Sequence, residues 1–381
     1  MTKKTIEDDL IEIFEKLHKN PELSYKEYET SKTLKGILKE YGIEILNLNL
    51  DSGLVAVIRG EHPGPVIAIR SDIDALPIQE NTGLPYQSLV SGIMHACGHD
   101  FHMTSVLGAA RLLNERRNEI HGTIKIIFQP AEEAPGGAQL IIDTGVLEDV
   151  KVYFGIHATP SLPVGTVGIG EGAVMAAVDK FSITVKGRGS HAAHPNEGID
   201  PIVVSSAIVM AVQSIVSRNM DPFSQGVVSI THLEAGNTWN VIPEQAYMEG
   251  TVRTMKPEDR VLFQNRLKAL AINVAEAYGA EAEFNWHPGP PAVINDGELA
   301  ELSKKVAEKN GYLIREAYRS LGGEDFSLYL QKEKGMFLRI GTGGGYPIHH
   351  PKFRVDRKAI MPTAKYLADL AIEYLQANII A

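Results

Sequence analysis

The first 130 residues alternate between two patterns of apolar and polar positions. Apolar residues recur every three or four positions over 6–17 and 104–120, which is the spacing of an amphipathic helix. Three short and nearly continuous apolar runs, as in buried strands, alternate with these segments at 53–60, 65–77 and 122–130. Such interleaving predicts an α/β domain with a central, mostly parallel sheet, whose ligands lie beyond the carboxyl ends of the strands.

The pattern changes between residues 179 and 290. Strand alternation and helical spacing follow one another there in the order β-α-β-β-α-β, which is the ferredoxin-like unit. We therefore predict a larger α/β domain built from 1–178 and 291–381, interrupted by an inserted α+β domain over 179–290. The proline-rich "HPGPPAVIND" (287–296) is the expected return linker.

Composition narrows the class of protein. The chain has 381 residues and a net charge of −10, and no run of Lys or Arg could neutralise phosphates, which argues against nucleic acid as a partner. No uninterrupted apolar segment reaches the ~18 to 20 residues of a membrane span, so no membrane partner is expected. A single cysteine excludes an internal disulfide framework, and the acidic residues within 6–17 argue against a secretory signal. We expect a cytoplasmic protein.

The segment "GIMHACGHDFHMTS" (92–105) suggests metal chemistry. It places the only cysteine, Cys97, two residues before His99, in a loop that leads into a helix. Glu132 and Glu133 follow one predicted strand, and His157 follows another. Of two adjacent carboxylates, one can bind an ion while the other takes a proton from a water molecule, as a hydrolase requires. A lone cysteine is more often a small buried hydrophobe, but these neighbours favour a ligand.

Eight motifs together carry a resemblance to a known family. In chain order they are "LHKNPELSYKEYETS", "RSDIDALPIQE", "MHACGHDFHMTS", "FQPAEEAPGGA", "GRGSHAAHPNEGIDP", "NVIPEQAYMEGTVRT", "GGEDFSLYL" and "IHHPKF". From about Leu17 to Phe353 the chain resembles the amidohydrolase branch of metallopeptidase family twenty. That branch includes hippurate hydrolase, the aminoacylases and the plant hydrolases of indole-acetyl-amino acids. The resemblance implies a zinc-peptidase-like catalytic domain with two zinc or manganese ions per chain, and an inserted lid domain that commonly also dimerises.

The resemblance also implies roles for residues of the larger domain. The implied metal ligands are Cys97, His99, Glu133, His157 and His349. Glu132 resembles the general base. Relatives read His-x-Pro-x-Phe in the last motif, which selects His349 and leaves His350 in the variable place.

Further polar residues lie near the implied ligands in the sequence and are expected to support the metal centre. Asp72 stands where other branches carry a metal-binding histidine, and Cys97 could compensate for that loss. Asp74 is expected to orient a ligand histidine. Asp100 could also orient a ligand histidine, or it could cap a helix N-terminus. His102 could support a ligand in the same way, or it could pack in the core.

The inserted domain and the "GGEDF" motif are expected to contribute to substrate binding. By resemblance, His191 stabilises the oxyanion, often from the partner subunit. Asn240 and Arg253 resemble the groups that bind the substrate's backbone or carboxylate, because an arginine fork suits a carboxylate, although Arg253 could also be a surface residue at a strand end. Gly323 and Glu324 are expected to line the pocket.

These observations predict a metal-dependent amidohydrolase that forms a homodimer or higher homo-oligomer. Its substrate would be a small N-acyl amino acid, such as an N-acetyl amino acid, or a dipeptide-like molecule. Two alternatives remain open from the sequence. One is a hydrolase with Cys97 as nucleophile, and the other is a non-catalytic, metal-stabilised binding protein on the same fold.

Overall fold

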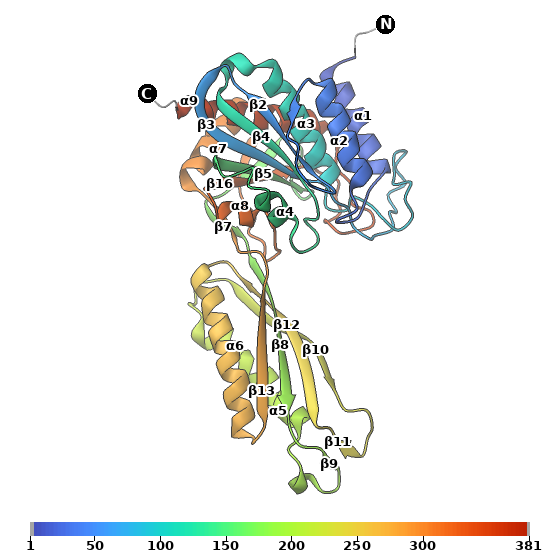
Figure 1. Cartoon of the computed structure of the whole chain (residues 1–381), viewed down its shortest axis with the longest axis vertical. Helices are drawn as coiled ribbons and strands as arrows, with labels where there is room; N and C mark the ends of the chain where they lie inside the picture. Colours follow the sequence, from blue (N-terminus) through green and yellow to red (C-terminus); the bar gives the residue numbers. More distant parts are fainter. Residues whose placement is uncertain (1–3, 379–381) are drawn as a thin grey trace. The chain divides into compact units, whose positions relative to one another are not determined.

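A computed structural model of the chain describes residues 4–378 and divides them into two compact units (Figure 1). The large unit contains the described residues up to Gly172, the segment Ile294–Tyr318 and the described residues from Asp325 onward. The inserted unit contains Ala173–Val293 and Arg319–Glu324. Its main segment thus begins and ends a few residues outside the interval 179–290 expected from the sequence.

The large unit is built on one eight-stranded sheet. The strand order is β1-β2-β4-β3-β5-β16-β6-β15. Four neighbouring pairs are parallel, namely β3/β4, β3/β5, β5/β16 and β6/β15, so the predicted mostly parallel sheet is confirmed. The strands span β1 Glu44–Ile45, β2 Leu54–Arg59, β3 His62–Asp72, β4 His121–Gln129, β5 Val150–Thr159, β6 Thr166–Ile169, β15 Leu313–Glu316 and β16 Gly335–Gly341.

Helices cover this sheet. Apolar side chains of α1, α3, α7 and α9 join those of β2 to β5 and β16 in one buried core. The shorter α4 and α8 pack against each other, and α4 also contacts β4. The helices span α1 Ile6–Lys19, α2 Tyr28–Glu40, α3 His99–Glu115, α4 Gly137–Asp143, α7 Gly297–Lys309, α8 Ser327–Leu330 and α9 Ile360–Ala377.

The start of α3 matters most for the site. The apolar spacing predicted this helix from residue 104 and the motif from residue 101, whereas the structure begins it at His99. The first turn of α3 is buried throughout, so no polar face marks it in the sequence. Gly98 precedes it with φ 91°, and a Cβ on Gly98 would lie 2.8 Å from the Cβ of Ala158. Only glycine fits this turn.

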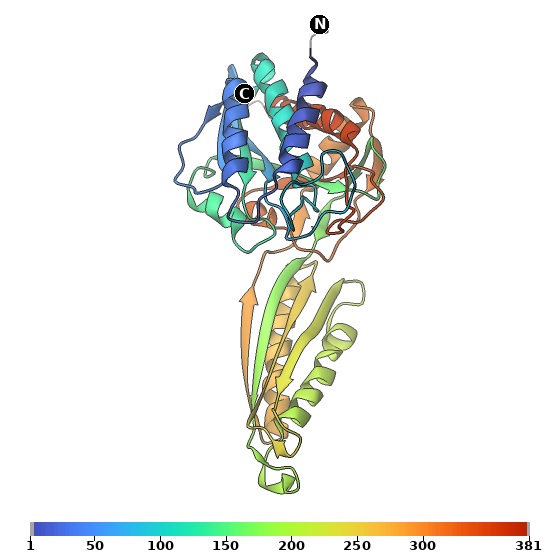
Figure 2. The same cartoon turned by 90° about the vertical axis from the view of Figure 1, so that its right-hand side faces the viewer.

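The inserted unit has the predicted β-α-β-β-α-β order (Figure 2). Its elements are β8 Ala177–Lys186, α5 Pro201–Val212, β10 Gly226–Ala235, β12 Gln245–Thr254, α6 Pro257–Ala277 and β13 Glu281–Pro288. The four strands form an antiparallel sheet in the order β10-β12-β8-β13, and side chains of both helices share one core with it. This is the ferredoxin-like arrangement. Strands β10 and β13 are its two edges.

Two short ladders complete the described chain. β9 (Ser190–His191) pairs with β11 (Val241–Ile242), and β7 (Gly172–Met175) pairs with β14 (Val293–Asn295). The β9/β11 ladder brings together two segments that the sequence analysis had singled out separately.

Candidate metal centre

Several of the predicted site residues lie at or just after the ends of strands of the large sheet. Asp74 comes two residues after β3, and Glu132 and Glu133 come just after β4. His157 lies near the carboxyl end of β5. Because β3, β4 and β5 run parallel, these ends meet at one edge of the sheet, where α/β proteins hold their ligands.

All five predicted metal ligands lie in one cluster. Two groups of donor atoms each lie within 4.8 Å of one another, namely Cys97 with Glu133 and His349, and His99 with Glu132 and Glu133. Glu133 belongs to both groups. Cys97 Sγ also lies 3.4 Å from His157 Nε2. Sulfur, nitrogen and carboxylate donors therefore converge at the start of α3.

The two adjacent histidines of the last motif have different surroundings. His349 Nε2 lies 3.1 Å from Glu133 Oε1. The ring of His350 stacks on Tyr346 at 4.9 Å, and its Nδ1 accepts the backbone N–H of Lys352. His349 is therefore the one that approaches the other predicted ligands.

His99 is arranged as a metal ligand. Its Nδ1 donates to the carbonyl of Asp74 at 2.8 Å and lies 3.2 Å from Asp74 Oδ1, so in the neutral ring the lone pair is on Nε2. That Nε2 is buried and makes no hydrogen bond among residues 4–378, and the nearest carboxylate oxygen, Asp72 Oδ2, lies 3.7 Å away. A buried polar atom that makes no hydrogen bond is rare in proteins, and this nitrogen is free to bind a cation. The residues therefore fit a divalent cation, and Asp74 lies where it was expected to orient a histidine.

Burial controls the electrostatics of Cys97 and His157. Burial raises the pKa of the Cys97 thiol well above its usual range, so a thiolate here requires an added positive charge such as a metal ion. Burial, and then the charge of Arg339, lower the pKa of His157 well below its usual range. His157 Nδ1 donates to the Ala158 carbonyl at 2.8 Å, which leaves its Nε2 unprotonated and facing Cys97. Neutral imidazole in this form can coordinate a metal.

Asp72 is buried beside Arg70, His99 and His102. Arg70 donates to Asp72 Oδ2 at 2.6 Å and to Asp325 Oδ1 at 2.8 Å. Burial opposes ionisation of Asp72, but nearby His99, His102 and Arg70 outweigh it and hold its pKa well below the usual range. The sequence analysis did not single out Arg70 or Asp325. The sequence feature that could have revealed Arg70 is its position within an apolar run, because a buried arginine must find a partner.

His102 connects Asp72 to the strand that carries His157. Its Nδ1 donates to Asp72 Oδ1 at 2.6 Å, and its Nε2 accepts the backbone N–H of Ala158 at 2.8 Å. These two bonds determine both the tautomer and the ring orientation. His102 therefore supports the backbone next to His157.

Asp100 does not face the predicted ligands. Its Oδ2 accepts a 2.6 Å hydrogen bond from His18 Nδ1, and its Oδ1 accepts the N–H of Phe101. His18 Nε2 lies 3.2 Å from Glu80 Oε1. The carboxylate thus links the first turn of α3 to the end of α1, a role that residue spacing did not reveal.

In the inserted unit, His191 and Asn240 lie together. β9 pairs with β11, and the N–H of Ala192 donates to the carbonyl of Asn240 at 3.0 Å. His191 is exposed, and its Nδ1 accepts the N–H of Ala193. The neutral ring therefore carries its proton on Nε2, as a hydrogen-bond donor to a substrate would.

Arg253 lies at the opposite end of the inserted sheet. It pairs with Val178 and Val227 near the carboxyl end of β12, whereas Asn240 precedes the amino end of that strand. Eight residues of extended strand separate Gln245 from Arg253, a distance of about 26 Å at ~3.3 Å per residue. One chain's inserted unit therefore does not bring Arg253 to Asn240 or His191.

The "GGEDF" motif is tightly packed. Glu324 is buried, and a Cβ on Gly323 would lie 2.5 Å from Val178 Cγ2. Gly323 is therefore needed for close approach to β8.

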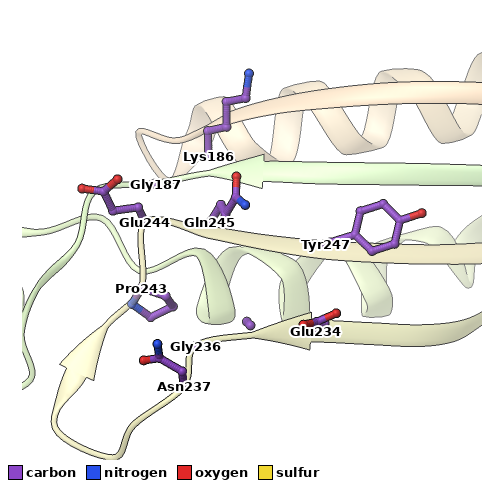
Figure 3. Close-up of a pocket in the computed structure, with 10 residues that line it drawn as sticks. Lys186, Gly187, Glu234, Gly236, Asn237, Pro243, Glu244, Gln245 and Tyr247 are labelled. Atoms are coloured by element: carbon purple, nitrogen blue, oxygen red, sulfur yellow. The ribbon is translucent and has the colours of Figure 1, made fainter.

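The inserted unit also contains a hollow of about 910 Å³ that is separate from the predicted site residues (Figure 3). It lies at the ends of β8, β10 and β12, and no predicted site residue is among those that line it. The lining residues are Lys186, Gly187, Glu234, Ala235, Gly236, Asn237, Pro243, Glu244, Gln245 and Tyr247.

Known proteins are similar to this chain in sequence and in fold. Residues 68–373 match Peptidase family M20/M25/M40. The N-acetylcysteine deacetylase of Bacillus subtilis is 48% identical over 377 residues, covering 99% of each chain. Thermostable carboxypeptidase 2 of Saccharolobus solfataricus is 40% identical over 380 residues, covering 97% of this chain and 96% of the relative. The Bacillus subtilis YXEP protein, described as a dinuclear metal binding peptidase from the M20 family, has a crystal structure that matches with a TM-score of 0.91. It is 46% identical, and the match covers 98% of this chain and 99% of that chain.

Proposed function

This chain belongs to peptidase family M20/M25/M40, and on that premise we propose that it is a metal-dependent amidohydrolase of N-acyl amino acids. It is a hydrolase that acts on C–N bonds. A relative named N-acetylcysteine deacetylase supports an N-acyl amino acid as substrate, and one named carboxypeptidase supports a dipeptide-like molecule.

The observation that carries the proposal is the convergence of donors around the orphaned, buried His99 Nε2. The residues that would hold two divalent ions are Cys97, His99, Glu133, His157 and His349. When bound, the ions supply positive charge that lowers the pKa of a water molecule and polarises the substrate carbonyl. Thiolate and imidazole suit zinc, and the carboxylates would also accept manganese.

Glu132 is the proposed general base. It stands next to Glu133, and its carboxylate lies within 4.8 Å of the donor atoms of His99 and Glu133. Glu132 removes a proton from the attacking water as the new C–O bond forms. The same carboxyl group then protonates the amide nitrogen as the C–N bond breaks and the amino acid leaves.

We propose that substrate binding uses residues of two chains. Arg253 would bind the substrate carboxylate through its planar fork, and Asn240 would bind the backbone of the same small molecule. Because Arg253 lies about 26 Å along β12 from Gln245, at the end of the sheet opposite to Asn240, the two could meet one substrate only if Asn240 and His191 come from a partner subunit. His191, with its proton on Nε2, would then stabilise the oxyanion. Gly323 and Glu324 would line the pocket.

A homodimer through the inserted unit is the proposed assembly. Strand β10 is an open edge of the four-stranded sheet and can pair with another strand. Helix α5 exposes Ile202, Val203 and Met210, with exposed fractions of 40%, 51% and 75%. Pairing β10 across a two-fold axis would bury apolar surface of this kind.

We propose that the protein works in the cytoplasm without a membrane partner. One helical run, Pro201–Asn219, is long and apolar enough to cross a membrane by length and composition alone. Its first part, α5, packs on α6 and on the inserted sheet, and several of its residues belong to the core of that unit. A helix of this kind is common in soluble domains and in subunit interfaces.

The two alternative functions receive less support. A Cys97 nucleophile requires a stabilised thiolate, whereas burial raises the pKa of this thiol. A non-catalytic binding protein would not need Glu132 beside the ligand cluster.

The test combines metal content with hydrolysis. Protein purified without chelator is analysed by plasma mass spectrometry and assayed on a panel of N-acetyl amino acids and dipeptides. We expect about two ions per chain, with activity lost on chelation and restored by zinc or manganese. Unchanged activity in protein that neither holds nor takes up metal would refute the proposal.

A further inference from the structure

Three residues other than glycine have a positive φ within residues 4–378. They are Tyr25 at 65°, Ala131 at 51° and His349 at 63°. The left-handed region is unfavourable for side chains with a Cβ, so it persists only where the surroundings impose it. Ala131 directly precedes Glu132, and His349 is a predicted ligand. Backbone strain is therefore concentrated at the metal centre.

Glu27 is the side chain that holds Ala131. It occupies the N-cap position of α2, but its side chain does not cap that helix. The carboxylate is fully buried, and Oε1 accepts the backbone N–H of Ala131 at 2.8 Å. Oε2 accepts a hydrogen bond from the Ser52 hydroxyl at 2.9 Å. Glu27 thus reaches a residue 104 positions away in the chain.

The neighbours of Glu27 reach the same loop at two more points, one directly and one through Asp74. The Ser24 hydroxyl donates to Asp74 Oδ2 at 2.6 Å, and that oxygen also accepts the N–H of Glu133 at 3.0 Å. The Tyr25 hydroxyl donates to the carbonyl of Pro135. Residues 24–27 therefore brace the loop before, at and after the pair Glu132 and Glu133.

Close backbone packing leaves this loop little room to relax. A Cβ on Gly137 would lie 2.1 Å from the Pro130 carbonyl oxygen and 2.4 Å from that of Ala131. A Cβ on Gly53 would lie 2.7 Å from Pro130 Cδ. The hydrogen bond from Ala131 to Glu27 is thus formed inside a packed cluster.

We propose that Glu27 is a positioning residue of the hydrolase: by accepting the N–H of Ala131 it keeps that residue left-handed and so sets the direction of Glu132 and Glu133. Its kinetic consequence rests on the proposed function. Burial raises the pKa of Glu27. A protonated, neutral carboxyl group at this position would still accept the N–H of Ala131 through its oxygen.

The first test compares two carboxylates of the same segment. Glu22 accepts the N–H groups of Glu29 and Thr30 at the start of α2 but does not contact the loop after β4. Glu27→Ala is expected to lower kcat by about 10- to 100-fold with KM changed less than about threefold, because the base is misplaced. It should also weaken zinc binding by about tenfold or more, because Glu133 moves. Glu22→Ala, the matched control, should alter thermal stability but neither kcat nor zinc affinity.

Two further variants separate positioning from general destabilisation. Glu27→Gln keeps an acceptor for the Ala131 N–H and should retain kcat within about threefold of the unmodified protein. Ala131→Gly introduced into Glu27→Ala should recover most of the lost kcat and zinc affinity, because glycine adopts a positive φ without help. A double variant no better than Glu27→Ala would overturn the proposal.

Hydrogen exchange provides a readout that does not depend on catalysis. In Glu27→Ala, peptides covering residues 128–137 should exchange at least about tenfold faster than in the unmodified protein, with or without zinc. Glu22→Ala should leave them unchanged. If no substrate is hydrolysed by the unmodified protein, the proposed function fails while the exchange and zinc arms still decide the role of Glu27. Equal exchange and equal zinc affinity in the Glu22 and Glu27 variants would refute that role.

Discussion

At the residue scale, the centre depends on side chains that do not themselves resemble ligands. Arg70 neutralises Asp72 and Asp325 inside the large unit, and His102 uses Asp72 to support the strand end next to His157. Removing one member of such a buried network leaves an uncompensated charge, which costs several kcal/mol. Networks of this kind explain why a few ligands can hold their positions before an ion arrives.

Glu132 provides the sharpest catalytic prediction. Glu132→Gln keeps the size of the side chain but removes the base, so kcat should fall by about 10²- to 10⁴-fold. Metal content measured by plasma mass spectrometry should stay the same, because Glu133 is the predicted ligand of the pair. The control is Glu133→Gln, which should lose metal as well. Loss of metal in both variants would show that Glu132 is itself a ligand.

His18 predicts a pH dependence of stability. Burial opposes its charged form, but hydrogen bonds and charges from Asp100 and Glu80 outweigh burial and raise its pKa to about 9. Because the pKa of the folded form lies above the ordinary 6.5, the stabilisation is fully present below pH 6.5 and is lost as the pH rises towards 9. The pKa values of Glu80 and Asp100 are lowered, so the stabilisation that these two carboxylates contribute is lost in acid.

The measurement is the difference in the free energy of unfolding between the unmodified protein and His18→Gln, determined by urea denaturation from pH 5 to pH 9.5. We expect a loss of roughly 3 kcal/mol near pH 6 that shrinks towards pH 9. A difference that grows as the pH rises would contradict this assignment.

At the element scale, the approximate positions of the first buried strands could be predicted, but the start of α3 and the order of the C-terminal strands could not. Periodicity located β2 to β4 because each is a short apolar run between turns. It missed the first turn of α3, which is buried, and it did not predict that β16 inserts between β5 and β6. That insertion matters, because β16 leads into the loop that carries His349.

The turn before α3 can be tested by replacing Gly98. Gly98→Ala would place a Cβ 2.8 Å from Ala158 Cβ at a φ of 91°, so it should destabilise the protein by about 2 kcal/mol or more. It should also weaken zinc binding, because Gly98 lies between Cys97 and His99. Thermal denaturation and zinc titration measure the two effects. Gly36→Ala is the control, since a Cβ there meets nothing within 4 Å.

At the scale of the whole molecule, two chains are predicted to form each active site. Equal amounts of Glu132→Gln and His191→Ala chains, each nearly inactive alone, are unfolded, mixed and refolded together. If His191 acts on the partner's site, about a quarter of all sites should combine an intact Glu132 with an intact His191. Hydrolysis rates of the mixture measure that fraction. No recovery in a mixture that has regained native mass would indicate that His191 acts within its own chain.

The interface itself can be tested through α5. Met210→Glu places a charge on the exposed apolar face of that helix, where Met210 is 75% exposed. We expect light scattering to report a smaller mass than for the unmodified protein. Burying an unpaired charge in the interface would destabilise the dimer by more than the apolar contact stabilises it. Lys268→Glu, on α6, is a comparison that should leave the mass unchanged. An unmodified protein that is already monomeric would exclude this assembly.

The sequence by itself determined the family, the α/β class with its ferredoxin-like insertion, and the set of candidate ligands. These follow from local information, since apolar spacing reports on an element and motif chemistry reports on ligand types. Only the tertiary structure decided which distant residues meet. Arg70 binds Asp325 across 255 positions, Glu27 binds Ala131 across 104, and Asp100 turns to His18. Spacing along the chain cannot encode such pairings, because packing of separate elements brings these groups together and burial then requires each to find a partner.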